Sequence, residues 1–419
     1  MNIGVFAEHI NSRVDISYLL NELSKKDEIT YYSESKVNPK YLDKKICHKK
    51  YSNQSNIKFL NKFSNIIFTV FGKHPKDTIH NSLVWERYAL DNSNNSLMSY
   101  YFKHFLIFLS KFFSKYLSYD FYLKMLFFKP SISILEHDVY IFFSDIVDNE
   151  ALSFLLKKNK KVLVYVYSWD HPPKFKSYSK RIHRFLTWNE SISKDLVNLH
   201  NLSAEKIKSI GSSQFSFLQE YISEQQDLKI LKDYDVLFCF STGSIKLIKQ
   251  EIKLLIKLCE ANPILTIHAR LYPFVKNHNL YEPLKLIDNL FLINSNYRDL
   301  NSINDFKKLA FDKYEQIEKS KIVIHCGTTM GLEACFLNSK VLFISLDCDY
   351  EDEDIVSFMH QYQNDRYLNL DYNSVIKNIK NFDLSSLSID NNEKYKQRIL
   401  QNFKLATIND ISKRIRSSL

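Results

Sequence analysis

Short, almost uninterrupted apolar segments recur along this chain, and helix-like stretches separate them. In the N-terminal half, VYIFFSD precedes NEALSFLLKKN, and KVLVYVYSWD follows it. In the C-terminal half, DVLFCFSTGS precedes the amphipathic stretch IKLIKQEIKLLIKLCEA, and PILTIHARLYP comes next. Apolar strands separated by helices are typical of parallel sheets that are covered on both faces. The pattern predicts an α/β fold that is built twice along the chain.

A chain of 419 residues is too long for one ordinary core, and two domains are expected. The strand–helix pattern restarts after the charged stretch LQEYISEQQDLKILKDY, which marks the predicted boundary. A last helix is expected from an approximate apolar stripe of Ile399, Leu400, Phe403, Ile408, Ile411 and Ile415. The predicted parts are an N-terminal Rossmann-like domain with a helical, aromatic-rich insertion near 76–130 (1–217), a linker (218–234), a C-terminal Rossmann-like domain (235–391) and a C-terminal helix (392–419).

The net charge of +10 favours an anionic partner, which is a nucleic acid, a membrane surface or a phosphorylated substrate. The lysines are dispersed, and the sequence holds no RNA- or DNA-binding motif. Nucleic acid is therefore not expected as a partner.

The cysteines indicate a reducing compartment. There are six, with no CxxC pair and no zinc-like spacing to histidine. Cys239, Cys259, Cys326 and Cys335 sit in apolar stretches and are interpreted as small core residues.

The start MNIGVFAEHINS is interpreted as a strand rather than a signal peptide, and no apolar stretch is long enough to span a bilayer. The expected location is cytoplasmic.

The segment KSKIVIHCGTTMGLEACFLNSKVLFISL holds two of only six glycines, Gly327 and Gly331. It is interpreted as a strand (321–325), a tight turn (326–329), a helix (330–337) and a second strand (340–346). Gly327 is expected to allow the sharp turn, and Gly331 to allow close approach of another backbone or of a ligand.

The predicted helix after this turn is a favourable place for a phosphate. The amides of Thr328, Thr329 and Met330 belong to a helix N-terminus, where backbone N–H groups bind anions. Glu333 lies beyond these amides and is expected to accept hydrogen bonds from a ribose diol. The alternative for Glu333 is a charge that only interacts with the helix dipole.

Three strand ends of the C-terminal half carry small, polar or basic residues. Because carboxyl ends of parallel strands form one edge of a sheet, where ligands of such sheets bind, these residues predict one site. Phosphate-binding turns, an arginine fork and a ribose acceptor together suit a nucleoside diphosphate. The candidate donor-binding residues are Ser241, Thr242, Gly243, Ser244, Arg270, Tyr272, Gly327, Thr328, Thr329, Met330 and Glu333.

HCGTTMGLEACFLNSKVLFI resembles the donor-binding segment of GT-B glycosyltransferases. RLYP resembles the RxHP element of bacterial surface-polysaccharide transferases in that superfamily, with Tyr272 where histidine is usual. VYVYSWDHP, RFLTWNES and IKSIGSSQF resemble the end of the N-terminal domain in such proteins. The resemblance implies two tandem Rossmann-like domains that face a central cleft, with a C-terminal helix that crosses back. It also implies a nucleotide-sugar donor in the C-terminal domain, with Glu333 on the ribose, and an acceptor in the N-terminal domain.

An inverting transferase needs a base that accepts the proton of the acceptor hydroxyl. Asp170, after the apolar run VLVYVYSW, is the first candidate, although it also suits a cap of the turn before two prolines. Glu8 and His9, at the end of the first strand, are the rival candidates. Asp145 is interpreted as a helix cap, and His325 as a structural histidine.

No cofactor and no metal ion are expected. The sequence has no DxD-like motif at a strand end, and the acidic run DCDYEDED (347–354) is interpreted as a solvated loop. Catalysis is therefore predicted to be independent of metal ions.

The stretch SYYFKHFLIFLSKFFSKYLSYD (99–120) has Lys103, Lys111 and Lys115 on one helical face and aromatic and aliphatic residues over the rest. Basic amphipathic helices of this kind lie in anionic membrane interfaces. A helix packed on the N-terminal sheet remains the alternative. The membrane interpretation places the protein peripherally on the inner face of the cytoplasmic membrane.

Together these features predict a glycosyltransferase that moves a sugar from a nucleotide-sugar donor to a cell-surface glycan or lipid-linked acceptor. Two alternatives stay open. One is an isomerase or hydrolase similar to nucleotide-sugar 2-epimerases, and the other is a non-catalytic scaffold with the same fold.

Overall fold

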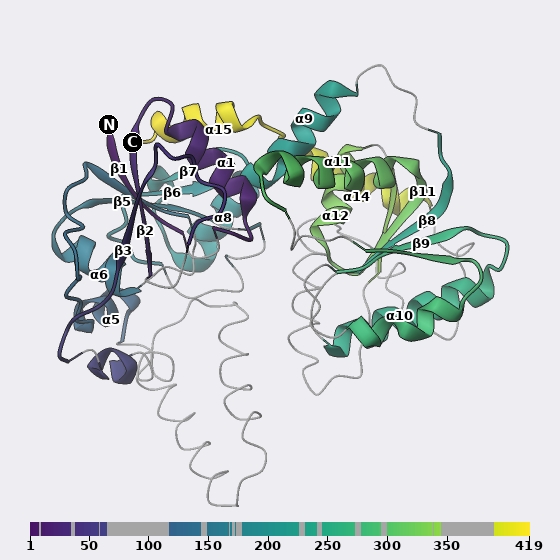
Figure 1. Cartoon of the computed structure of the whole chain (residues 1–419), viewed down its shortest axis with the longest axis horizontal. Coiled ribbons are helices and arrows are strands. Elements are labelled where there is room, and N and C mark those ends of the chain that lie inside the picture. The colour runs from purple at the N-terminus through teal and green to yellow at the C-terminus, as the bar shows by residue number, and fades with distance from the viewer. Residues whose placement is uncertain are drawn as a thin grey trace, which may run out of the picture. The chain divides into compact units, whose positions relative to one another are not determined.

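The computed structural model divides the chain into two compact units (Figure 1). The first unit comprises Met1–Gln214 with Ile408–Leu419, and the second comprises Phe215–Thr407. The residues that the structure describes are 1–7, 10–34, 38–57, 59–64, 117–143, 149–166, 168–169, 172, 178–225, 231–240, 245–272, 278–294, 300–337, 339–344 and 389–419.

A seven-stranded parallel sheet forms the first unit. The strand order is β3-β2-β1-β4-β5-β6-β7, which is the order of a doubly wound Rossmann-like sheet with one strand added. Every residue of β4 and nearly every residue of β5 is buried, as the apolar runs predict. The strands are β1 (Asn2–Phe6), β2 (Glu28–Glu34), β3 (Cys47–Tyr51), β4 (Val139–Phe142), β5 (Lys161–Tyr165), β6 (Arg184–Thr187) and β7 (Ile207–Ser209).

The helices of the first unit include four that connect or precede these strands. Local caps define both ends of α8 (Glu190–His200). The Asn189 side chain accepts a hydrogen bond from the Ile192 amide at 2.8 Å, and Asn201 ends the helix in the left-handed conformation. The four helices are α1 (Val14–Leu23), α5 (Tyr119–Met125), α6 (Asn149–Lys157) and α8 (Glu190–His200).

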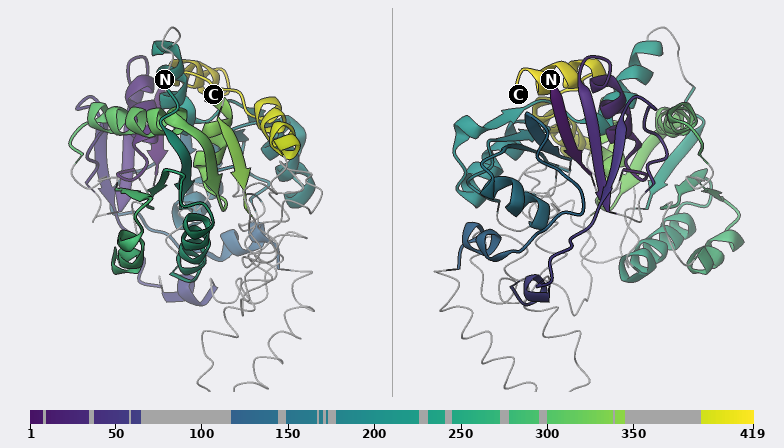
Figure 2. Two further views of the ribbon diagram at one scale, coloured as in Figure 1. Left: turned by 90° about the vertical axis from the view of Figure 1, so that its right-hand side faces the viewer. Right: turned by 60° about the vertical axis from the view of Figure 1, so that its left-hand side comes forward.

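The C-terminal segment returns to the first unit, as predicted. It is two helices and not one: α14 (Ile389–Asn402) belongs to the second unit, and α15 (Ile408–Arg416) packs on α1 (Figures 1 and 2). Arg416 Nε binds Asp27 Oδ2 at 2.8 Å and secures this contact. The apolar stripe is buried except for Leu400, which is 41% exposed.

The second unit is built on a five-stranded parallel sheet in the order β10-β9-β8-β11-β12. This order is again Rossmann-like, so the predicted α/β class is confirmed for both units. The sequence pattern did not predict β3, β10 or α11. The elements are α9 (Ser216–Glu224), β8 (Tyr234–Cys239), α10 (Ile245–Ala261), β9 (Ile267–Arg270), the 3₁₀ segment η3 (His278–Leu286), β10 (Leu290–Ile293), α11 (Ile303–Lys319), β11 (Ser320–His325), α12 (Thr329–Phe336) and β12 (Lys340–Phe343).

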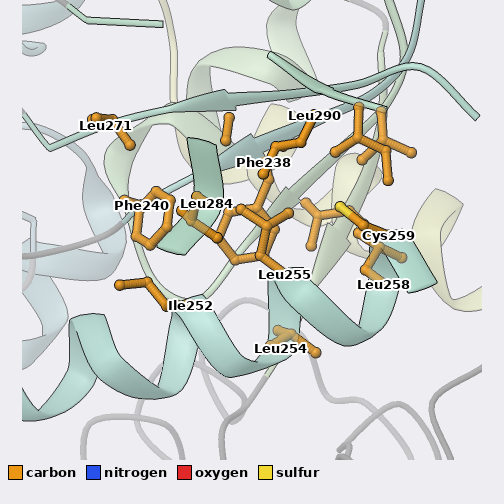
Figure 3. Packing of buried hydrophobic residues seen from close by; sticks show 14 of the residues in the cluster. Phe238, Phe240, Ile252, Leu254, Leu255, Leu258, Cys259, Leu271, Leu284 and Leu290 are labelled. Carbon is orange, nitrogen blue, oxygen red and sulfur yellow. The ribbon is translucent and has the colours of Figure 1, made fainter. Parts of the chain in front are cut away.

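Helices cover the two faces of this sheet. Figure 1 shows α10 on one face and α11 on the other. On the α10 side, Leu255 and Leu258 pack against Phe238 and Phe240 in a continuous apolar core (Figure 3). Burying such a side chain stabilises the fold by about 1.5–3 kcal/mol.

The division between the units lies after Gln214, slightly before the predicted linker at 218–234. The reason is apolar burial: Phe217, Leu218 and Tyr221 of α9 are buried, and the ring of Tyr221 lies 5.4 Å from that of Tyr314 on α11. The N-terminal part of the charged stretch is therefore a packed helix of the second unit.

The four cysteines predicted as small core residues are buried and free. They are Cys239, Cys259, Cys326 and Cys335. Cys47 is exposed and also free.

Candidate functional site

Both sheets reverse their strand order beside their first strand, β1 in one unit and β8 in the other. In doubly wound sheets, ligands bind outside the carboxyl ends of the strands at this reversal. In the second unit the reversal lies between β8 and β11. The loops that begin there are 241–244, which lies outside the described residues, and the turn after His325.

The turn after β11 has the geometry that the sequence predicts. Gly327 has φ of 119°, a conformation that side chains rarely adopt. Thr328 caps α12: its hydroxyl accepts the Met330 amide at 3.4 Å, and its carbonyl accepts the Gly331 amide at 3.1 Å. The Met330 amide is thus engaged by the cap. The amides of Thr328 and Thr329 precede it at the same helix N-terminus.

Gly331 serves a different purpose from the one predicted. A Cβ atom there would lie 2.1 Å from His325 Nε2 and 2.3 Å from its Cε1. The group that approaches Gly331 is therefore the histidine ring, and the expectation of a ligand or backbone contact is corrected. His325 is buried, and its Nδ1 accepts the Gly327 amide at 3.2 Å. Burial lowers the pKa of His325 to about 3, which fits the predicted structural role.

Three residues lie in one row at the carboxyl end of the second sheet. Cys239 on β8 is paired with Arg270 on β9 and with His325 on β11. Side chains alternate along a strand, and Phe238 and Phe240 face the α10 core, so this row faces α11.

Arg270 is buried in this row, with 4% of its surface exposed. Its Nη1 donates to Gln316 Oε1 of α11 at 2.6 Å. Its Nη2 has no hydrogen-bond acceptor among the described residues. The guanidinium is therefore held on one side and keeps donor capacity on the other.

Glu333 of α12 is also buried, with 1% of its surface exposed. Its Oε1 accepts from Lys313 Nζ at 2.7 Å, in an ion pair whose side chains are 15% and 2% exposed for Lys313 and Glu333. Within the described part of the chain, its Oε2 has no donor. The acid is more than a surface charge at a helix terminus, because it is buried and paired.

Charged groups from several elements act on the Cys239 thiol at the end of β8. Burial raises the pKa of Cys239 to about 12, with smaller effects from the charges of Arg270, Glu333, Lys313 and Glu251. The two cations oppose the rise and the two acids add to it. Charges from β9, α10, α11 and α12 thus gather around the end of β8, and the thiol itself stays protonated at neutral pH.

Lys313, Gln316 and Glu251 were missed by sequence reasoning. The sequence indicates candidate chemistry at strand ends, whereas these three residues lie within helices. A lysine and a glutamine one helical turn apart resemble any solvated helix face, so no sequence signal distinguishes them.

Tyr272 is half-buried and packs against the apolar core on the α10 side. The other candidates, Glu8, His9, Asp170 and Ser241–Ser244, lie outside the described residues, as do Asp145, 99–116 and 347–354.

The first unit has its own polar cluster at the carboxyl edge of its sheet. Asp15 of α1 receives two bonds from Arg13, at 2.7 and 2.8 Å, and one from the Ser213 hydroxyl at 2.6 Å. The Ser213 amide in turn donates to the Tyr165 hydroxyl at 3.0 Å. Burial alone would raise the pKa of Asp15, but Arg13 and the hydrogen bonds hold it below its usual value. This network ties the segments that follow β1 and β7 to the last residue of β5.

Across the described ranges, no group of three or more His, Cys, Asp or Glu side chains is arranged to hold a metal ion. No helix in that part of the chain has the length and apolar character needed to cross a membrane.

No family model matches the chain. No curated protein matches it either. Solved structures that resemble it include three that share 9–11% identity with it. They include UDP-GlcNAc 2-epimerase from Neisseria meningitidis bound to UDP-GlcNAc, with 11% identity, TM-score 0.43 and coverage of 100% of this chain and 99% of that chain. A glycosyltransferase from Rickettsia africae has 10% identity, TM-score 0.46 and coverage of 99% and 97%. MurG from Acinetobacter baumannii has 9% identity, TM-score 0.45 and coverage of 99% and 99%.

The fold class follows from the strand orders themselves. Two Rossmann-ordered units stand in tandem, and the C-terminal helix returns to the first unit. Tandem Rossmann-like units and a returning C-terminal helix are features that the resemblance to GT-B glycosyltransferases implies.

Proposed function

We propose that this chain is a glycosyltransferase that binds a nucleotide-sugar donor at the carboxyl edge of its second unit. The observation that carries the proposal is the pair Arg270 and Glu333, each buried and each with one polar atom unpartnered among the described residues. Leaving a buried polar atom unsatisfied costs about 1–3 kcal/mol, and more when the group is charged. A ligand that engages both atoms removes that cost.

A nucleoside diphosphate has the matching chemistry. In this proposal, Arg270 Nη2 donates to a phosphate oxygen, and Glu333 Oε2 accepts from a ribose hydroxyl. The amides of Thr328 and Thr329, at the N-terminus of α12, add donors for a phosphate. The sugar is then transferred to a cell-surface glycan or lipid-linked acceptor bound by the first unit.

The proposed chemistry is inverting and independent of metal ions. Asp170 is the first candidate for the base that takes the proton from the acceptor hydroxyl, and Glu8 and His9 are its rivals. Full loss of activity on EDTA treatment, restored by Mg²⁺ or Mn²⁺, would contradict metal independence.

The proposal also includes contact of the 99–120 segment with anionic lipid on the inner face of the cytoplasmic membrane. Its motivation is the basic face of that segment, with aromatic residues over the rest.

The first test is binding of UDP, GDP, ADP and CDP, measured by thermal shift and isothermal titration. One of them is expected to bind, and at 100 times its Kd a ligand stabilises the folded state by about 2.7 kcal/mol. If none binds at millimolar concentration, the proposed function is wrong.

The second test incubates the protein with sugars of the nucleotide that binds, with and without an acceptor panel. Transfer that requires an acceptor supports the transferase. Epimer formation or rapid nucleotide release without acceptor would show the isomerase or hydrolase alternative. Binding without any turnover would indicate a scaffold.

A further inference from the structure

Arg270 and Glu333, the two charged side chains of the candidate site, are both bound by side chains of α11. Lys313, which binds Glu333, and Gln316, which binds Arg270, both belong to α11 and are three residues apart. Residues at this spacing lie on the same helix face, one turn from each other. One face of α11 therefore holds both the Glu333 carboxylate and the Arg270 guanidinium.

Lys313 and Gln316 are themselves held in place by neighbouring groups. Lys313 Nζ lies 4.6 Å from the ring centre of Tyr314, which is 1% exposed, so an aromatic ring and a carboxylate confine the ammonium. The main chain at Gln316 is bound by the Ser320 hydroxyl, which donates to its carbonyl at 2.6 Å. At its start, α11 has a capping box in which Ser302 and Asp305 exchange hydrogen bonds.

Each support occupies only one atom of the group it holds. Gln316 engages Nη1 of Arg270, and Lys313 engages Oε1 of Glu333. In the described part of the chain, Arg270 Nη2, which donates, and Glu333 Oε2, which accepts, have no partner.

The geometry points to Lys313 and Gln316 as positioning residues for a ribonucleoside diphosphate. Lys313 orients Glu333 toward the ribose hydroxyls, and Gln316 orients Arg270 toward the phosphates. This inference rests on the proposed function and adds to it that α11 sets ribose selectivity and phosphate affinity through two separate side chains.

The alternative is that both pairs only stabilise the packing of α11 on the sheet. Removing either support would then loosen the whole site and weaken every ligand alike. The positioning role predicts instead that each variant affects one part of the ligand.

The experiment is isothermal titration calorimetry with three probes. All three carry the nucleobase of the nucleoside diphosphate that binds the wild-type protein. The probes are the ribonucleoside diphosphate, its 2′,3′-dideoxy analogue and the nucleoside without phosphates. The variants are Lys313→Met and Gln316→Leu. Lys319→Met is the matched control, because Lys319 pairs with Glu315 on the same helix at 31% exposure.

We expect Lys313→Met to reduce the preference for ribose over dideoxyribose by about 10- to 100-fold, the value of a hydrogen bond to a charged group. Gln316→Leu is expected to reduce the preference for diphosphate over nucleoside by a similar factor while ribose preference stays unchanged. The effect of Lys313→Met is expected to vanish in a Glu333→Gln background, and that of Gln316→Leu in an Arg270→Met background. Lys319→Met is expected to match the wild type.

Equal weakening of all three probes by both variants, or no effect of either, would overturn the inference while leaving the proposed function intact. Failure of the wild-type protein to bind any nucleotide would overturn both. Lys313→Gln, which keeps a donor, replaces the methionine variant if that protein does not fold, and the Gln316 measurement stands independently of it.

Discussion

Gly331→Ala is the substitution whose effect follows most directly from the packing around His325. The added Cβ would lie 2.1–2.6 Å from three atoms of the His325 ring, well inside van der Waals contact. The ring is buried and accepts the Gly327 amide, so it has little room to move. Either the ring or the first turn of α12 must shift.

The expected magnitude is a balance of three effects. Overpacking costs about 1–3 kcal/mol. Loss of the hydrogen bond from the Gly327 amide to His325 Nδ1 costs about 1 kcal/mol more. Alanine gains back about 1 kcal/mol, because it is the better helix former. We therefore expect Gly331→Ala to destabilise β11 and α12 by about 1–3 kcal/mol.

Hydrogen–deuterium exchange of β11 and α12 peptides measures this effect locally, which matters in a chain of two units. The amides that open with this region are expected to exchange about 5- to 150-fold faster, while first-unit amides stay unchanged. In a His325→Ala background, where the ring is absent, Gly331→Ala is expected to be neutral or stabilising. If Gly331→Ala alone is as stable as the wild type, the histidine is not what requires a glycine here.

Glu333→Gln is expected to weaken ribonucleoside diphosphate binding by about 1.5–3 kcal/mol with the fold retained, measured by titration and circular dichroism. Unchanged affinity would reduce Glu333 to a structural charge. Asp170→Asn is expected to lower kcat by about 10²–10⁴ with donor affinity unchanged, unless variants of the rival residues in the first loop abolish activity instead. Asp15 has a folded-state pKa below its ordinary 3.8, so its stabilising effect is present above that pH and is lost as the pH falls through the folded value. The difference in the free energy of unfolding, measured with urea, between the wild type and Asp15→Asn is therefore expected to become smaller as the pH falls. A difference that grows would contradict the ion-pair explanation. Replacing the three lysines of the 99–120 segment with glutamate is expected to release the protein from anionic vesicles. If the wild-type protein never binds such vesicles, the segment does not contact anionic lipid, and the alternative of a helix packed on the N-terminal sheet is favoured.

The elements that the sequence predicted correctly are those with a visible apolar signal. β4, β5, β8 and β11 are buried runs, and α10 shows a helical apolar period, so their burial is encoded in consecutive residues. β3, with the sequence CHKKY, was missed because an edge strand with mostly exposed or half-exposed residues lacks such a run.

The last helix shows why a stripe alone can mislead. Ile399 and Phe403 are buried in the second unit, whereas Ile408 and Ile411 are buried in the first. The apolar residues of this one pattern are therefore buried in two separate cores. The helix is interrupted between the two groups of residues, so α14 and α15 are separate helices.

The sequence alone predicted the α/β class, the repeated strand–helix pattern, the strand end that carries Arg270 and the helix after β11 that carries Glu333. It did so because apolar period, turn glycines and strand ends are properties of neighbouring residues. Tertiary packing shows, in addition, that Gly331 makes room for His325 and that Lys313 and Gln316 hold the two charges. These are contacts between elements, and helix packing on a sheet brings the groups together without leaving a mark on the local sequence.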